Sequence, residues 1–226
     1  MVLVACLGQW LAACGQNTSD HIDFALRTLT FEVSNRGSQW RSPPQGPVPN
    51  MVCAGPQALS TDCCSLVVSG SPIDCQQYPF ACDPSTNYCA LTFDVELHTQ
   101  VDLVAEVPEV AAVDGRAFAR VSLSSLTTTI GGLDDLPVRS ARLYIGPGSL
   151  MSSSDPAATL LGEVNLAAAV SPLMPSAAGQ QAFSGLARDY RAPFAFLLST
   201  HLVVGNGTNP GGIVSFDVSA RAEAYY

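Results

Sequence analysis

The chain has 226 residues, of which 47% are hydrophobic and 13% charged, and its net charge at pH 7 is −9. This hydrophobicity excludes a disordered protein, because disorder requires few apolar residues and many charges. The acidic balance argues against binding to nucleic acid, since phosphate neutralisation needs a basic surface. The length is enough to bury one core and to carry a small additional unit.

Residues 1–14, MVLVACLGQWLAAC, are apolar and carry no charge. They are too few to span a bilayer as a helix, and they have the hydrophobic stretch and small-residue end of a secretory signal. Leu11-Ala12-Ala13-Cys14 resembles the lipobox of bacterial lipoproteins, in which a signal peptidase cuts before the cysteine and the cysteine is acylated. The positive residues that open such a signal in the family are absent from this segment. The alternative is a buried first strand that ends in Ala-Ala-Cys.

The resemblance implies a signal peptide at 1–13, a lipidated Cys14 and a polar tether at 14–20. In the family, an Asp after the cysteine favours retention in the inner membrane, whereas this chain has Gly15. We therefore expect a cell-envelope protein held at the outer membrane by its lipid anchor, facing the periplasm or the cell surface. Several acyl chains on one residue suffice for stable anchoring, which a single chain does not provide.

A cysteine-rich segment between positions 53 and 89 holds six of the eight cysteines. Export places them in an oxidising compartment, where an even number of cysteines in a loop-rich stretch predicts disulfides. The pairing stays open, although strain disfavours a bond between two adjacent cysteines. A zinc site is disfavoured because the spacings differ from those of zinc ligands and no histidine lies among them. The predicted disulfide cysteines are Cys53, Cys63, Cys64, Cys75, Cys82 and Cys89.

The proline-rich run SPPQGPVPN separates this segment from the preceding residues. The segment has little to bury, so disulfides would be needed to order it. Because predicted strands lie on both sides, we interpret 42–89 as a disulfide-stapled insertion into a β-sandwich domain that extends over 21–226. Asp83-Pro84-Ser85-Thr86-Asn87 is predicted to be a turn, since it lacks the spaced acidic residues of a calcium loop.

Alternating apolar and polar side chains predict most of the remaining secondary structure. A change of parity inside a predicted strand, as in 21–33 and 117–130, indicates a bulge. The only predicted helix covers 180–190. The predicted strands are 21–33, 90–103, 117–130, 138–145, 159–170, 194–204 and 214–223. Of these, 194–204 is a continuous apolar run, which is consistent with a central strand. This pattern predicts an all-β fold, an antiparallel β-sandwich with a disulfide-rich loop insertion and at most one short helix.

Catalytic motifs are absent from the sequence. No nucleophile elbow, phosphate loop, zinc-binding histidine pair or C-x-x-C motif occurs. A hydrolase triad would need a nucleophile, a base and an orienting acid, but His21 and His98 are expected on the surface and His201 half-buried. Asp134-Asp135 is expected to be a solvated turn. We therefore predict that the chain is not an enzyme and has no catalytic residue, cofactor or metal ligand.

The order of lipobox, cysteine-rich insert and β-sandwich resembles uncharacterised lipoproteins of GC-rich Gram-negative bacteria, a resemblance that brings no known activity. We expect a non-enzymatic, lipid-anchored binding or assembly module with an envelope protein as partner. One alternative is a glycan-binding or adhesin-like surface module, which would stack sugars on Trp40, Tyr78, Phe80 or Tyr88. These aromatic residues are otherwise expected to form the small core of the insert. A second alternative is a secreted hydrolase of unrecognised type.

Overall fold

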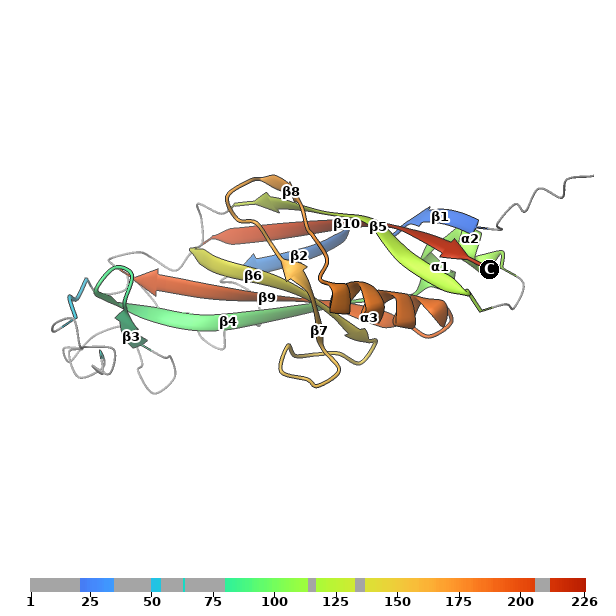
Figure 1. Cartoon of the computed structure of the whole chain (residues 1–226). Helices are drawn as coiled ribbons and strands as arrows, with labels where there is room; N and C mark the ends of the chain where they lie inside the picture. Colours follow the sequence, from blue (N-terminus) through green and yellow to red (C-terminus); the bar gives the residue numbers. More distant parts are fainter. Residues whose placement is uncertain are drawn as a thin grey trace, which may run out of the picture.

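The computed structural model of the chain describes residues 21–34, 50–53, 63, 80–113, 117–132, 137–205 and 212–226. These residues form two antiparallel β-sheets that pack against each other around one main core, with short helices at the periphery (Figure 1). The predicted fold class, an all-β sandwich, is confirmed. None of the described helices is long and apolar enough to cross a membrane.

Each sheet is built from five strands. Sheet A has β10 (Ile213–Tyr225) beside β5 (Arg120–Gly131), with β8 (Val170–Pro172) at one edge and β1 (His21–Ala25) and β2 (Leu29–Ser34) sharing the other. The strand order of sheet B is β3 (Phe80–Asp83), β4 (Tyr88–Val101), β9 (Phe194–Gly205), β6 (Val138–Pro147) and β7 (Thr159–Glu163).

The main core lies between the sheets, because every long strand buries alternate residues on its inner face. In β10 the inner residues Val214, Phe216 and Val218 are fully buried, and the residues between them are partly or fully exposed. In β9 the inner residues Phe194, Phe196 and Leu198 face them. Complete burial of such a side chain contributes about 1.5–3 kcal/mol, so the apolar residues on these inner faces stabilise the contact between the two sheets.

The parity change predicted in 21–33 is confirmed, but it separates two strands instead of forming a bulge in one. β1 and β2 pair with successive halves of β10, and the chain between them leaves the regular ladder. Phe24 is buried before the break, and Leu29 and Phe31 are buried after it. The parity change predicted in 117–130 is a true irregularity, because the register of β5 and β10 shifts between Arg221 and Ala222.

The prediction of one strand over 159–170 was wrong. β7 ends at Glu163 in sheet B and β8 begins at Val170 in sheet A, so the chain crosses from one sheet to the other. In the crossing, the side chain of Asn165 accepts a hydrogen bond from the Ala167 amide at 3.0 Å. Such a local turn competes with strand pairing, and apolar content alone did not reveal it.

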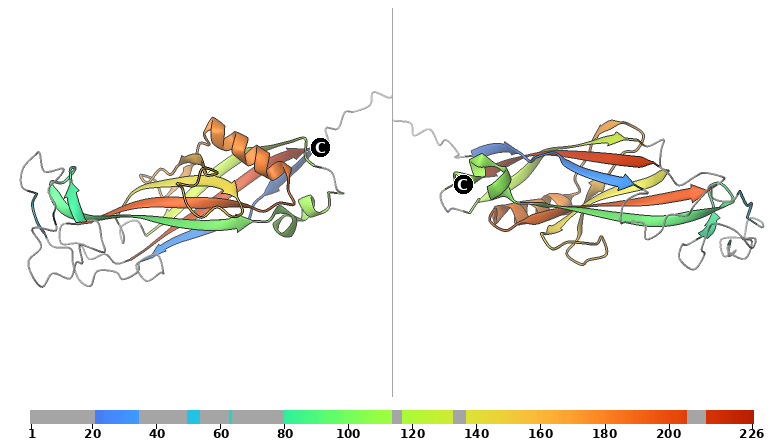
Figure 2. Two further views of the ribbon diagram at one scale, coloured as in Figure 1. Left: turned by 90° about the horizontal axis from the view of Figure 1, so that it is seen from below. Right: turned by 180° about the vertical axis from the view of Figure 1, so that it is seen from behind.

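Helix α3 (Ala177–Arg188) begins three residues before the predicted helix because Ser176 caps it, accepting a hydrogen bond from the Gly179 amide at 2.9 Å. The helix lies over β5, β6 and β7 (Figure 2). Its residues Phe183 and Ala187 are buried in the main core. A side chain at position 179 would meet the backbone of Leu161 at 2.8 Å, so glycine permits this close approach.

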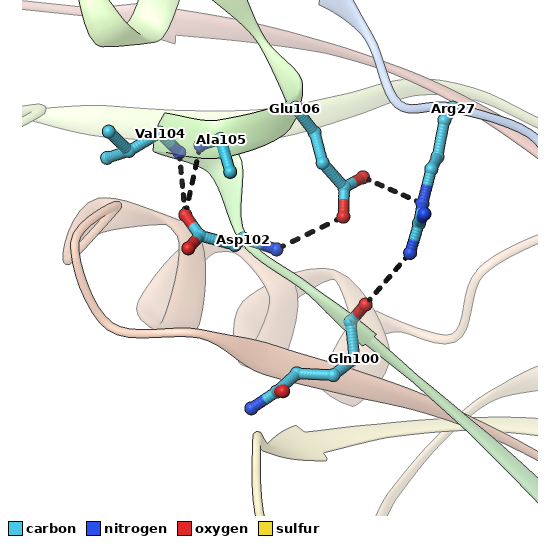
Figure 3. Close-up of polar contacts among 6 residues, drawn as sticks. All are labelled: Arg27, Gln100, Asp102, Val104, Ala105 and Glu106. Atoms are coloured by element: carbon cyan, nitrogen blue, oxygen red, sulfur yellow. Dashed lines mark hydrogen bonds and ion pairs between the residues drawn. The ribbon is translucent and has the colours of Figure 1, made fainter.

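Two single-turn helices, α1 (Leu103–Glu106) and α2 (Pro108–Ala111), were not predicted, because four residues are too few to show helical periodicity. Asp102 caps α1 by accepting hydrogen bonds from the amides of Val104 and Ala105 (Figure 3). The Glu106 carboxylate accepts a hydrogen bond from the Asp102 amide at 3.3 Å and forms an ion pair with Arg27 Nε at 3.2 Å. Arg27 Nη2 also donates a hydrogen bond to the Gln100 carbonyl at 3.4 Å, so Arg27 connects the break between β1 and β2 to α1 and to the end of β4 (Figure 3).

The sandwich is elongated, and its two ends differ (Figures 1 and 2). We call the end with β1, α1, α2 and the last residue of the chain the base. The opposite end, with β3, the start of β4, Met51–Cys53 and Cys63, is called the tip. The last residues of the predicted insertion, 80–89, belong to sheet B as β3 and the start of β4.

Candidate functional site

Two disulfides fasten the tip. Cys53 is bonded to Cys82 on β3, and Cys63 is bonded to Cys89 on β4. All four residues are among the cysteines predicted to form disulfides, and the sequence left their pairing open. Cys14, Cys64 and Cys75 lie outside the described residues, so their predicted roles stay predictions. The Sγ atoms of Cys53, Cys63 and Cys89 lie within 4.8 Å of one another, but bonded sulfurs are not thiolates and do not offer a metal site.

The disulfides lie on the inner face of the sheet at the tip. Val52 forms an antiparallel bridge with Tyr88, so Met51–Cys53 runs beside the first residues of β4. The sulfurs pack into a second, small core beside the main one. Its buried members are Cys53, Cys63, Phe80, Cys89, Leu91 and Val204. Phe80 therefore belongs to the core of the insert. This agrees with the interpretation of the aromatic residues as core residues, the alternative to a role in stacking sugars.

The predicted turn at Asp83–Asn87 is confirmed. It closes the β3–β4 hairpin, and Asn87 adopts a left-handed conformation with φ of 60°. One carboxylate oxygen of Asp83 accepts hydrogen bonds from the amide and hydroxyl of Ser85 at 3.0 and 2.8 Å. The other accepts from the Thr86 hydroxyl and from Arg139 Nη2, both at 3.0 Å. The carboxylate thus holds the hairpin and anchors an arginine from β6.

The electrostatics of Asp83 follow from these contacts. Partial burial acts to raise the pKa of Asp83, but the hydrogen bonds from Ser85 and Thr86 and the charge of Arg139 outweigh it, so the pKa lies below its usual value of 3.8. On the same face, the hydrogen bond to Glu163 at 3.1 Å raises the pKa of Arg142. Both side chains therefore stay charged at neutral pH.

A hollow of about 170 Å³ opens on the outer face of sheet B, behind the disulfides. Asp83 and Tyr88 point to this face because they are register partners, one position along from the inward Cys82 and Cys89. The disulfides therefore fix the inner faces of β3 and β4, and the outer faces of the same two strands line the hollow. Its lining residues are Asp83, Thr86, Tyr88, Ala90, Pro137, Arg139, Val203 and Gly205.

A bulge in β6 brings two polar residues to this face. The register of β6 with β9 runs from Val138↔Leu202 to Ser140↔His201, so Arg139 is an extra residue. Val138 packs against the core and Ala141 is buried in it, whereas Arg139 lines the outer hollow. Arg139 and Ser140 therefore both lie on the outer face, an arrangement that regular alternation forbids.

A histidine and an aspartate meet in the row of residues next to the hollow. His201 Nδ1 lies 2.8 Å from Asp94 Oδ1 on the neighbouring β4, and the two residues are register partners. The other register partner of His201 is Ser140 on β6. The sequence predicted a half-buried His201 correctly, because its side chain is 40% exposed. It missed the juxtaposition, since Asp94, Ser140 and His201 are far apart in the chain.

The other residues considered from the sequence lie elsewhere. His98 is exposed on β4, as predicted. His21, at the base, stacks on Tyr225 with ring centroids 5.6 Å apart. Asp134-Asp135, Trp40 and Tyr78 lie outside the described residues. Two further hollows, of about 610 and 480 Å³, are open depressions that involve β5 with α3, and β10 with β1.

Comparison with known proteins gives no family. No protein-family model and no curated protein matches the chain. A chain of the heated full particle of Israeli acute paralysis virus is 9% identical, with a TM-score of 0.29, over all of this chain and 85% of that one. Chains of turnip yellow mosaic virus and desmodium yellow mottle tymovirus are 13% and 12% identical. Their TM-scores are 0.20 and 0.21, with 60% and 59% of this chain and 81% and 84% of theirs covered. Scores this low carry no argument about fold or function.

Proposed function

We propose that the chain is a lipid-anchored binding or assembly module of the cell envelope, held at the outer membrane through Cys14. The lipobox-like Leu11-Ala12-Ala13-Cys14 supports the anchor. The two disulfides of the described part support an oxidising compartment, since such bonds are rare in the reducing cytosol. The proposed partner is an envelope protein that docks on the outer face of the tip.

The observation that carries the proposal is the placement of the tip at the far end of the sandwich from His21 (Figure 1). His21 follows Cys14 by seven residues. Because an extended chain covers at most about 3.5 Å per residue, the base stays within about 25 Å of the acylated cysteine. The tip is then the end that an anchored protein presents away from the membrane.

The hollow at the tip offers polar chemistry on a rigid support. Arg139 and Asp83 form an ion pair there, and the side chains are 47% and 11% exposed. The guanidinium has five N–H donors and uses one of them on Asp83, so it can reach a partner's carboxylate or carbonyl. The stapled hairpin holds Asp83 in place, which lowers the entropy lost on binding.

The anchor is tested with Cys14→Ser. The variant should incorporate no radiolabelled palmitate and should be released from membranes, because it lacks the thiol that accepts the lipid. Palmitate incorporation equal to that of the unmodified chain would refute the anchor.

The binding surface is tested by affinity purification of the tagged lipoprotein from envelope extracts. Arg139→Ala should lose the captured envelope protein, whereas Arg142→Ala should keep it. Arg142 is a matched control, because it lies on the same strand and face and pairs with Glu163 outside the hollow. Equal capture by both variants would exclude the tip hollow as the binding surface.

A glycan-binding module is the second candidate, favoured by one observation. Tyr88 lines the hollow together with Asp83 and Arg139, and an aromatic face beside paired polar groups is suited to a sugar ring. Calorimetric titration with soluble envelope glycans should give binding that Tyr88→Ala abolishes and Tyr225→Ala, at the base, leaves unchanged. Absence of binding to any envelope glycan would leave the protein partner as the better account.

A further inference from the structure

We propose that Ser140, His201 and Asp94 form a nucleophilic acyl-transfer site that hydrolyses small carboxylic esters, with the leaving or acyl group seated in the tip hollow. The sequence argued against an enzyme because no motif joins these residues. The fold joins them across three neighbouring strands of sheet B, and this activity goes beyond the binding role proposed above.

The three residues form one row across the sheet. Asp94 on β4 and Ser140 on β6 are both register partners of His201, on the central strand β9. Register partners on adjacent antiparallel strands have Cβ atoms about 4.5–5.5 Å apart. The order of the row, acid then base then hydroxyl, is the order that a catalytic triad requires.

Ser140 lies opposite His201 as the first pair of the regular β6–β9 ladder, and the bulge at Arg139 comes directly before this pair. The bulge places Arg139 on the outer face beside Ser140, while Val138 still packs against the core. Bulges next to functional sites commonly serve to re-aim a side chain in this way. The Ser140 hydroxyl forms no hydrogen bond with the described residues, so it is open to His201 and to a substrate.

The contact with Asp94 determines which nitrogen of the His201 imidazole can act as the base. Its Oδ1 lies 2.8 Å from His201 Nδ1, and this contact favours the tautomer with the proton on Nδ1. Nε2 then carries the lone pair and can accept the proton of the Ser140 hydroxyl. Asp94 is thus a positioning residue, and Ser140 and His201 are the catalytic residues.

The hollow beside the row is the proposed binding pocket for the substrate. Val203 follows His201 by two positions on the outer face, and Arg139 precedes Ser140, and both line the hollow of about 170 Å³. Arg139 supplies donors for a carboxylate or carbonyl oxygen of the substrate. The volume and this donor favour a small, polar ester over a long acyl chain.

The reaction balances with water as the second substrate. Ser140 Oγ attacks the ester carbonyl, and His201 Nε2 takes the hydroxyl proton and passes it to the departing alcohol as the C–O bond breaks. A water molecule then attacks the acyl-serine, giving its proton to His201, and the carboxylic acid leaves as Ser140 regains its proton. Asp94 and His201 are 68% and 40% exposed, so solvent weakens their interaction and we expect slower turnover than in a buried triad.

The test uses the full, disulfide-bonded lipoprotein in detergent and two probes. A fluorophosphonate should form an adduct on Ser140, located by peptide mass spectrometry, and p-nitrophenyl acetate should be hydrolysed faster than in buffer. Ser140→Ala should lose both signals. His201→Gln should slow adduct formation by about 100-fold, since general-base catalysis contributes factors of this order or more.

Control variants separate catalysis from folding. Ser199→Ala and His98→Gln alter the same outer face outside the row and should keep the rates of the unmodified chain. Asp94→Asn should slow the reaction and Asp94→Glu should restore part of it, which a purely structural role would not produce. Circular dichroism and the melting temperature establish that each variant is folded. A folded protein with no adduct on Ser140, or with equal labelling in His201→Gln, would overturn the proposal.

Discussion

The base and the tip of the sandwich are stabilised in different ways. At the base, Phe118 packs against Tyr190 and Tyr226 with ring centroids 5.1 and 5.7 Å apart, and Arg27 pairs with Glu106 beside the capped α1. At the tip, the second core has six buried residues, three of which are cysteines in disulfides. The base relies on packing and polar contacts, and the tip relies on covalent bonds.

The difference follows from how much apolar surface each end can bury. The base belongs to the main core, where large side chains from both sheets and α3 meet. The tip extends beyond this core. Its second core is too small to offset the conformational entropy that the residues of the tip lose on folding. Disulfides restrict the unfolded chain instead, as in small extracellular domains. The polar hollow thus lies on the strands that the disulfides hold in place.

The largest expected effect comes from removing one disulfide with Cys63→Ser and Cys89→Ser together. The tip should lose about 2–4 kcal/mol of stability, because the unfolded segment regains its freedom. Hydrogen exchange should accelerate in β3 and at the start of β4 and stay unchanged in β5 and β10. Equal acceleration in both sheets would mean that the tip and the base unfold as one unit and would remove the contrast between them.

A smaller effect is expected at the base from Arg27→Ala. Glu106 is 13% exposed, and its Oε2 has no hydrogen-bond partner among the described residues apart from the ion pair with Arg27. Loss of the cation leaves a largely buried carboxylate uncompensated. Because Arg27 itself is 58% exposed and water screens the pair, we expect a cost of about 1–2 kcal/mol in chemical denaturation. Arg221→Ala, at an exposed position of β10, is the control, and an equal change in both variants would contradict the assigned role of Arg27.

The smallest effect concerns acid stability of the tip. The pKa of Asp83 is lower in the folded chain than its ordinary value of 3.8, so the stabilising contribution of this carboxylate is complete above that pH. It is lost as the pH falls below that value through the folded pKa. In the unmodified chain, the protection factors of the β3–β4 hairpin amides in hydrogen exchange should therefore fall in this acid range. Asp83→Asn should remove that pH dependence of the protection factors. A dependence that persists in Asp83→Asn would assign it to another group.

Periodicity in the sequence was sufficient for most of the fold. Alternation in β4 and β10 predicted antiparallel strands because a half-buried sheet selects apolar residues at every second position. The continuous apolar run of β9 predicted a central strand, and residues 194–198 are all buried. The parity changes near Leu26 and near Ser124 marked real breaks in the ladder. The crossing at Asn165 and the helices α1 and α2 were missed, since single hydrogen bonds and caps decide them and leave no periodic pattern.

Composition predicted disulfides in the cysteine-rich segment, and tertiary structure chose the partners. Cys53 and Cys82 meet because Met51–Cys53 and β3 both lie beside β4, a fact of strand order that spacing cannot reveal. The same reason applies to the candidate site. Asp94, Ser140 and His201 lie on three different strands, and only the register of those strands brings them into a row. Where alternation is regular, the sequence by itself determined which residues face outward, because that depends on local periodicity. Long-range pairing decided which of them became neighbours and placed the bulge that turns Arg139 outward.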